Sequence, residues 1–336
     1  MNLDRLQEIV LEEGLPKFTA RQIAQWIYVK HCRSIDQMSN LSKAARERLS
    51  QKYEVGVPAP LMVHTSADGT KKYLFGTHTD MAVEAVMIPD GERATLCVSS
   101  QAGCRMGCRF CMTGRQGFHG NLSTAQIIGQ FLGVEEHDRL TNTVFMGMGE
   151  PMDNLEAVLG ALEILTAPWG FAWSPKRITV SSIGVIPNLK VLLDQTKVHI
   201  AISLHNPFPS QRMELMPMEK AWPIEKVLAL LRQYDFTGQR RVSFEYTIFS
   251  GLNDSKVHAD ALIRLLRGLE CRVNLIRFHA IPDSPLKTAP LSAMEMFRDR
   301  VSAGGITATI RASRGEDIFA ACGLLSGEHR NGSNDL

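Results

Sequence analysis

The sequence predicts an α/β protein whose main body is a partial TIM-type barrel of six strand–helix units, preceded by a small helical accessory domain. Beyond residue 95, short apolar segments alternate with segments of helical periodicity, the pattern of a parallel sheet with crossover helices. Before residue 60 the apolar residues keep helical spacing. We therefore expect a helical domain (1–60), a small β extension (61–95), the barrel (96–311) and a C-terminal segment with a polar tail (312–336).

The helical domain is predicted from three amphipathic segments, LDRLQEIVLEEG, TARQIAQWIYVKH and SKAARERLSQKY. The second is expected to open after Thr19, a residue type that caps helix N-termini. Its apolar stripe of Ile23, Trp26 and Ile27 is expected to face the core. Nucleic-acid binding by the Arg and Lys residues around that stripe is the less favoured alternative.

The β extension is predicted from two alternating segments, KKYLFGT and AVEAVMI, and from the turn motifs ADGT and PDGE. These features indicate a small antiparallel sheet that leads into the barrel. Glu84 stands between apolar residues in VEAV, so alternation directs its carboxylate to one face of the strand.

The barrel is predicted from its regular alternation of strands and helices. Ser123 and Gln126 have capping-box spacing and predict the start of the first crossover helix. Ligand sites in such barrels lie at the carboxyl ends of the strands, so residues that follow a strand are candidates for function. The barrel strands are expected at 95–100, 141–147, 177–182, 198–205, 241–249 and 271–279, with a last strand at 306–312.

Composition restricts the class of protein. Lys and Arg total 37 against 35 Asp and Glu, so a nucleic-acid site would have to be a local basic patch. No apolar run approaches the roughly 20 residues of a membrane span, and the acidic amino terminus differs from a secretory signal, which predicts a cytoplasmic protein without membrane contact. Seven cysteines, partly clustered, favour metal or redox chemistry over a secreted disulfide framework.

Three cysteines, Cys104, Cys108 and Cys111, form a CxxxCxxC motif just after the first barrel strand, amid glycines that let the backbone wrap round a ligand. Three thiolates hold three irons of a 4Fe-4S cube and leave the fourth iron open to a substrate or cofactor. Structural zinc would require a fourth ligand nearby, and inert buried thiols are the remaining alternative. Cys32 and Cys271 are expected to be buried thiols that take no part in the chemistry.

A CxxxCxxC motif in this position resembles the radical S-adenosylmethionine (SAM) superfamily, and Phe110 inside the motif fits either that superfamily or plain core packing. The segments ATLCVSSQAGCRMGCRFCMTGRQGFHGNL, FMGMGEPMDNL, SLHNP and RGEDIFAACG together resemble, in the same order, the RNA adenine methyltransferases of the RlmN/Cfr family. This resemblance covers nearly the whole chain from about residue 15. It implies a radical SAM barrel with a 4Fe-4S cluster and two SAM molecules per turnover.

The resemblance implies a catalytic pair of cysteines, which falls on Cys97 of LCVSSQ and Cys322 of AACG. An adenine carbon has no lone pair with which to attack a methyl group, whereas a thiolate does, so Cys322 would take the methyl group first. Once the methyl carbon has joined the ring, Cys97 would release the product by forming a disulfide with Cys322. The family's proton acceptor falls on Glu84, which without the resemblance is an ordinary strand-face carboxylate.

A SAM pocket at the strand ends is also implied. The glutamate of GMGEP would accept hydrogen bonds from the SAM ammonium group. Two residues stand where the family usually has asparagine: His279, which can still donate to a hydroxyl or carboxylate, and Glu219, which alters local substrate contacts. The residues that match the SAM site are Gly149, Glu150, Ser181, Ser203, Leu204, His205 and His279.

RATLCVSS and GMGEP are more similar to the RlmN branch, which methylates carbon 2, than to the Cfr branch, which methylates carbon 8. The implied substrates are tRNA and an adenosine in the peptidyl-transferase region of 23S rRNA, which would have to be splayed from its stack. A flavodoxin or ferredoxin is the implied electron donor, and a monomer is expected. The basic residues that would hold phosphates are Arg105, Arg109, Arg115, Lys176, Arg177, Arg212, Arg240, Arg241 and Arg314.

Two other classes of function stay open from the sequence. One is a radical SAM enzyme with a non-RNA substrate, whose chemistry would not need Cys97 and Cys322. The other is an RNA-binding module without catalysis, stapled by zinc.

Overall fold

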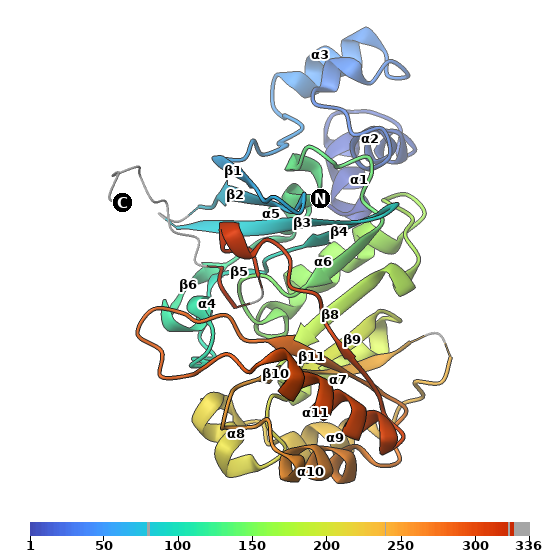
Figure 1. Cartoon of the computed structure of the whole chain (residues 1–336). Coiled ribbons are helices and arrows are strands. Elements are labelled where there is room, and N and C mark those ends of the chain that lie inside the picture. Colours follow the sequence, from blue (N-terminus) through green and yellow to red (C-terminus); the bar gives the residue numbers. More distant parts are fainter. Residues whose placement is uncertain (79–80, 239, 322, 326–336) are drawn as a thin grey trace.

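A ten-stranded mixed sheet runs through the molecule and forms its core (Figure 1). The computed structural model describes residues 1–78, 81–238, 240–321 and 323–325. The first four strands pair antiparallel and every later pair is parallel. In pairing order the strands are β1 (Met62–Thr65), β2 (Lys71–Gly76), β3 (Ala82–Asp90), β4 (Arg93–Cys97), β7 (Asn142–Phe145), β8 (Ile178–Ser182), β9 (His199–Ser203), β10 (Val242–Ile248), β11 (Arg272–Arg277) and β12 (Thr307–Ile310).

The parallel strands from β4 to β11 are the six barrel strands that the sequence predicts, so the partial barrel is confirmed. Neighbouring crossover helices pack on one another around the sheet, as α5 does on α6 and α10 on α11. Among the described residues, no helix is both long enough and apolar enough to cross a membrane. The helices that follow the barrel strands are α5 (Thr124–Gly133), α6 (Leu155–Thr166), α7 (Ile186–Gln195), α8 (Pro209–Leu215), α9 (Ile224–Leu231), α10 (Lys256–Leu266) and α11 (Leu291–Ala303).

Helix α5 begins with the predicted capping box. The Ser123 hydroxyl accepts a hydrogen bond from the Gln126 backbone N–H at 3.2 Å, and the Gln126 side chain accepts one from the Ser123 N–H at 2.9 Å. Two backbone donors at the helix start are thereby satisfied.

The β extension continues the barrel sheet, because β3 pairs antiparallel with β4 through the predicted PDGE turn. The sequence does not predict a second, two-stranded sheet, formed by β5 (Gln101–Gly103) and β6 (Phe118–Asn121). Between these strands lie the cysteine motif and the short helix α4 (Met112–Arg115). The loop that carries the cysteine motif requires a glycine at position 103. The φ of Gly103 is +72°, and a side chain there would clash with the Gly117 carbonyl.

Three helices, α1 (Leu3–Glu12), α2 (Thr19–Tyr28) and α3 (Lys43–Ser50), form one end of the molecule, at the top of Figure 1. Helix α2 includes Thr19 in its first turn, and its N-cap, Phe18, has no side-chain cap. The expected opening after Thr19 is therefore off by one residue. Ile23 is buried, as predicted, and the end of α2 packs Tyr28 against Trp169, with ring centroids 6.1 Å apart.

Candidate active site

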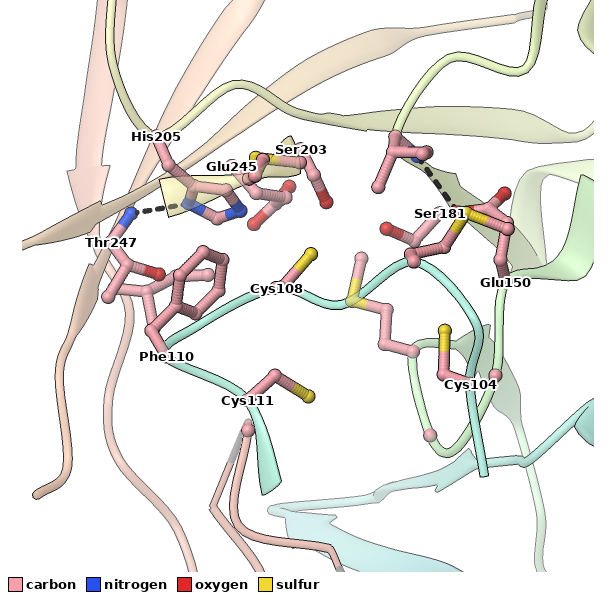
Figure 2. A pocket seen from close by; sticks show the side chains of 18 of the residues that line it. Cys104, Cys108, Phe110, Cys111, Glu150, Ser181, Ser203, His205, Glu245 and Thr247 are labelled. Carbon is pink, nitrogen blue, oxygen red and sulfur yellow. Dashed lines mark hydrogen bonds between the residues drawn. The ribbon is translucent and has the colours of Figure 1, made fainter. Parts of the chain in front are cut away.

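The three motif cysteines face a cavity of about 160 Å³ at the carboxyl ends of the barrel strands. Figure 2 shows the thiols of Cys104, Cys108 and Cys111 directed into this space. The opposite wall comes from the barrel strands and includes Ser203 of β9 and Glu245 of β10. The cavity is thus where the barrel rule places a ligand site.

The thiols fit an iron–sulfur cluster better than a single ion. Burial raises the pKa of Cys104 to about 12 and also raises the pKa values of Cys108 and Cys111, so these thiols need cationic ligands to ionise. Among the described residues, no three His, Cys, Asp or Glu side chains converge as ligands of one ion. A 4Fe-4S cube binds each cysteine through a separate iron, so its thiolates need not converge. The three cysteine thiols therefore fit a cluster.

The C-terminal segment lies against the cysteine motif. The backbone N–H of Met112, next to Cys111, donates to the Gly323 carbonyl at 2.8 Å. The Thr113 hydroxyl donates to the Leu325 carbonyl at 2.7 Å, and Gly323 lines the cavity. The predicted catalytic residue Cys322 lies outside the described residues.

Glu150 is a buried carboxylate at the cavity wall, in the loop after β7. Its Oε1 accepts from the Met152 N–H at 3.1 Å, and its Oε2 accepts from the Ile183 N–H at 3.0 Å. Burial raises the pKa of Glu150 to about 7, against these hydrogen bonds, which favour the charged form. Gly149 before it has a φ of +99°, and a side chain there would press on Gln101.

His205 is a neutral histidine at the edge of the cavity. Its Nδ1 accepts a hydrogen bond from the Thr247 N–H at 2.9 Å, which leaves the proton on Nε2. Burial, together with the charge of Arg212, lowers the pKa of His205 to about 3. The ring stands edge-on to Phe110 at 4.7 Å, and both rings line the cavity. Phe110 therefore packs in the core and shapes the site at once.

The other predicted SAM residues separate into two groups. Ser181 of β8 and Ser203 of β9 line the cavity beside Gly149 and Glu150. Leu204 and His279 are not among the described residues that line it. Leu204 is fully buried, whereas His279 Nε2 lies 3.0 Å from the Ser313 hydroxyl, at the base of the C-terminal segment.

Arg212 and Arg240 are not phosphate ligands, so the prediction was wrong for these two basic residues. Both are buried, and Arg240 donates to the Leu193 carbonyl at 2.7 Å. Arg212 donates to the Ser203 carbonyl at 2.8 Å and forms a buried ion pair with Glu219. Glu219 is therefore the counter-ion of a residue that supports the cavity wall.

Strand register places the predicted catalytic residues Glu84 and Cys97 on the same face of the sheet. Cys97 of β4 pairs directly with Val86 of β3, and Glu84 lies two residues from Val86. Paired residues, and residues two apart on one strand, point to the same face. Lys72 of β2 also pairs with Val86, and its Nζ lies 3.2 Å from Glu84 Oε1.

That face continues into the cavity wall. Cys97 pairs with Val144, which pairs with Thr179, two residues before Ser181. Ser181 pairs with Ala201, two residues before Ser203, and Ser203 pairs with Glu245. The predicted catalytic residues of the β extension and the predicted SAM residues therefore line one continuous surface.

Sequence reasoning missed Lys72 and Glu245. The available signal for Glu245 was a charged residue inside the apolar strand VSFEYTIF, at a position that a buried strand rarely gives to a carboxylate. Lys72 directly follows Lys71, so the two side chains point to opposite faces of the sheet. Only the strand register shows which of the two faces Glu84.

Comparison with known proteins agrees with this architecture. Residues 98–262 match the radical SAM superfamily, and residues 1–55 match the ribosomal RNA large subunit methyltransferase N-terminal domain. A Phocaeicola vulgatus protein named probable dual-specificity RNA methyltransferase RlmN is 56% identical over 324 residues, covering 96% of this chain and 93% of that protein. The dual-specificity RNA methyltransferase RlmN of Syntrophus aciditrophicus is 40% identical over 98% of this chain and 95% of its own length.

A solved structure is also similar over nearly its full length. The crystal structure of a radical SAM methyltransferase from Sphaerobacter thermophilus superimposes with a TM-score of 0.92 at 38% identity, and the match covers 98% of each chain. With these matches, the motifs and the cysteine-lined cavity, the chain belongs to the RlmN family of the radical SAM superfamily.

Proposed function

We propose that this chain is an RNA methyltransferase that adds a methyl group to carbon 2 of an adenosine in 23S rRNA and in tRNA. The names of its relatives support an RNA substrate. The observation that carries the proposal is the single sheet face that joins Glu84 and Cys97 to the cavity of the three-cysteine loop. Chemistry that needs a radical source and two further reactive groups would have the two reactive groups on that face and the cysteine loop across the cavity from it.

As a radical SAM protein, the chain uses a 4Fe-4S cluster and SAM. In the proposal, Cys104, Cys108 and Cys111 hold the cluster, which with SAM supplies a hydrogen-abstracting radical. Glu150 and the strand-end serines hold SAM in the cavity. The neutral ring of His205 adds a donor N–H at the cavity edge. Two SAM molecules are used in each turnover, one for the methyl group and one for the radical.

Three residues of the chain carry out the remaining steps: methyl transfer, proton removal and product release. Cys322 accepts the methyl group on its sulfur, and after hydrogen removal this carbon joins the adenine ring as a protein–RNA bridge. Glu84 takes the ring proton. Cys97 attacks the Cys322 sulfur as the carbon–sulfur bond breaks; the released carbon takes up a proton to complete the methyl group, and the unpaired electron left by the radical addition would pass from the new disulfide to the cluster.

The RNA must present its adenosine outside a helical stack, because the cysteine-lined cavity lies at the mouth of a packed barrel. The flavodoxin or ferredoxin donor and the monomeric state stay predictions from the sequence.

The release step gives the sharpest test of these roles. In the Cys97→Ala protein, reconstituted anaerobically and given SAM and an rRNA fragment, the bridge forms but does not resolve. We expect a covalent protein–RNA species on a denaturing gel, at least tenfold above wild type. Mass spectrometry should place the RNA on the Cys322 peptide.

Two control variants separate this outcome from a general defect. Cys322→Ala should give neither the covalent species nor methylated RNA. Cys271→Ala, which replaces a half-buried cysteine just before β11, should behave as wild type. Normal methylation by Cys97→Ala, or an RNA bridge that forms without Cys322, would refute the assigned roles.

A further inference from the structure

Phe319 is an exposed aromatic residue on the segment that leads to the proposed methyl-carrying cysteine. Its side chain is 64% exposed, and it stands three residues before Cys322 and four before Gly323, which lines the cavity. The residues on either side of it are turned inward, because Ile318 packs against the core and Ala320 is buried. The segment thus buries its smaller apolar side chains and presents its largest one to solvent.

The backbone of Phe319 has a conformation that bulky residues rarely adopt. Its φ is +52°, in the left-handed region. Two hydrogen bonds fix this turn: the Phe319 N–H donates to the Glu316 carbonyl at 3.2 Å, and the Ala320 N–H donates to the Gly315 carbonyl at 2.8 Å. Among the described residues, no other exposed large apolar side chain has a positive φ. Strain of this kind is concentrated at functional positions.

The ring is attached to a firmly held backbone beside the proposed proton acceptor. Lys72 donates to the Phe319 carbonyl at 3.5 Å, and the same ammonium group lies 3.2 Å from Glu84 Oε1. The short helix η5 (Glu316–Ile318), just before Phe319, is fixed on the turn between β1 and β2 through the carboxylate of Asp317. A side chain on an anchored backbone loses little freedom when it binds a ligand, which favours a contact made by this ring.

A single exposed apolar side chain needs no explanation by itself. Phe319 differs because strain, anchoring and closeness to the reacting groups coincide at one residue. We propose that Phe319 stacks on an RNA base next to the target adenosine and so helps to hold that adenosine outside its helical stack. The inference rests on the proposed function, which supplies the RNA. An adenosine drawn into the cavity gives up stacking on its neighbours, and an aromatic ring can replace one of these contacts.

The first test is methylation of an rRNA fragment by the anaerobically reconstituted protein, measured over a range of RNA concentrations. For Phe319→Asn we expect a KM for RNA about tenfold higher, the size of one lost base-stacking contact, with kcat unchanged. SAM cleavage in the absence of RNA should not change either. Asparagine adopts a positive φ more readily than phenylalanine does, so a merely structural role predicts no loss in this variant.

Three further variants show whether the aromatic ring itself is needed. Phe319→Tyr keeps the ring and should behave as wild type, whereas Phe319→Leu keeps only apolar bulk and should resemble Phe319→Asn. Met296→Gln is the control for loss of an exposed apolar side chain, because Met296 is 65% exposed on α11 and has no proposed role. This variant should keep the wild-type KM.

The second test is a photocrosslink, which locates the contact without any substitution. Two RNA fragments carry 5-iodouridine directly before or directly after the target adenosine, because light couples this base to aromatic side chains stacked on it. With the wild-type protein, mass spectrometry should place the crosslink on Phe319 for one of the two fragments. The crosslink should be absent with Phe319→Asn.

Each other outcome overturns the proposal. An unchanged KM in Phe319→Asn, or wild-type behaviour of Phe319→Leu, would show that stacking on this ring does not hold the RNA. A lower kcat at an unchanged KM would mean that Phe319 only places Cys322. If Phe319→Asn does not fold, absence of a crosslink to Phe319 from both fragments still decides against the proposal. Failure of the wild-type protein to methylate any RNA would refute the proposed function itself.

Discussion

Lys72 is the residue that ties the proposed proton acceptor to the C-terminal segment. Its ammonium group lies 3.2 Å from Glu84 Oε1 and 3.5 Å from the Phe319 carbonyl, three residues before Cys322. A lysine between these groups holds the carboxylate close to the segment that leads to the proposed methyl-carrying cysteine. Its contribution is to position both.

Replacing Lys72 with Met should therefore uncouple radical formation from methylation. We expect Lys72→Met to form methylated RNA about tenfold more slowly per SAM cleaved, because a displacement of about 1 Å at a reacting centre can cost up to about a hundredfold and the variant removes only one of the contacts that hold the segment. SAM binding should not change. Lys71→Met is the matched control, because Lys71 lies on the other face, paired with Glu135 and Glu136. Equal yields of methylated RNA per cleavage in both variants would contradict this role.

His205 makes a pH prediction about stability. Its pKa is about 3 in the folded protein against 6.5 for an ordinary histidine, so the unfolded chain binds more protons between these values. Stability is therefore lost as pH falls below 6.5. At pH 5 the free energy of unfolding is about 2 kcal/mol lower than at neutral pH, because each pH unit below 6.5 costs about 1.36 kcal/mol.

The comparison is urea unfolding of wild type and His205→Gln at pH 7 and pH 5. The variant should lose about 2 kcal/mol less than wild type over this range. Parallel losses in the two proteins would show that His205 does not stay neutral in the fold.

At the scale of elements, the short helix η5 (Glu316–Ile318) is held on the turn between β1 and β2. Asp317 accepts from the Ser66 hydroxyl at 2.5 Å and from the Ala67 N–H at 3.1 Å. From the other side of the turn, Asp68 accepts from the Gly315 N–H at 3.1 Å. The β extension thus anchors the segment that leads to Cys322.

Loosening this anchor should affect only steps that involve Cys322. For Asp317→Ala we expect about fivefold less methylated RNA, since the proposed nucleophile is less well placed, with SAM cleavage in the absence of RNA unchanged. Asp260→Ala, which breaks an exposed ion pair with Arg300 between α10 and α11, is the control. A fall in both activities would indicate general destabilisation instead.

The regular elements could be predicted from the sequence, because periodicity reports which residues are buried. Every barrel strand overlaps its predicted range, and the Ser123 capping box is present. The β5–β6 pair was not predictable, since its strands are very short and glycine-rich. The buried ion pair of Arg212 and Glu219 could not be predicted either. Charged residues are usually exposed, and the sequence does not show which of them form a buried pair.

At the scale of the molecule, one sheet brings together residues from distant parts of the chain. The cysteine motif was predicted from its spacing and its place after the first barrel strand, whereas the SAM residues were predicted from the family resemblance. The register of successive strand pairs decides which residues share a face of the sheet. It places Lys72, Glu84 and Cys97 on the same face as Ser203 and Glu245. A one-residue slip at any pair would move side chains to the other face, and no sequence pattern shows register across long connections.

In the proposed function, this shared face directs a methyl group to one carbon of an RNA adenosine. The most direct measurement uses methyl-labelled SAM with the anaerobically reconstituted protein, a reductant, and a 23S rRNA fragment or tRNA. The RNA is then digested and its nucleosides are separated and weighed by mass spectrometry. We expect the label in 2-methyladenosine. Label in 8-methyladenosine, or no labelled nucleoside while SAM is still cleaved, would contradict it.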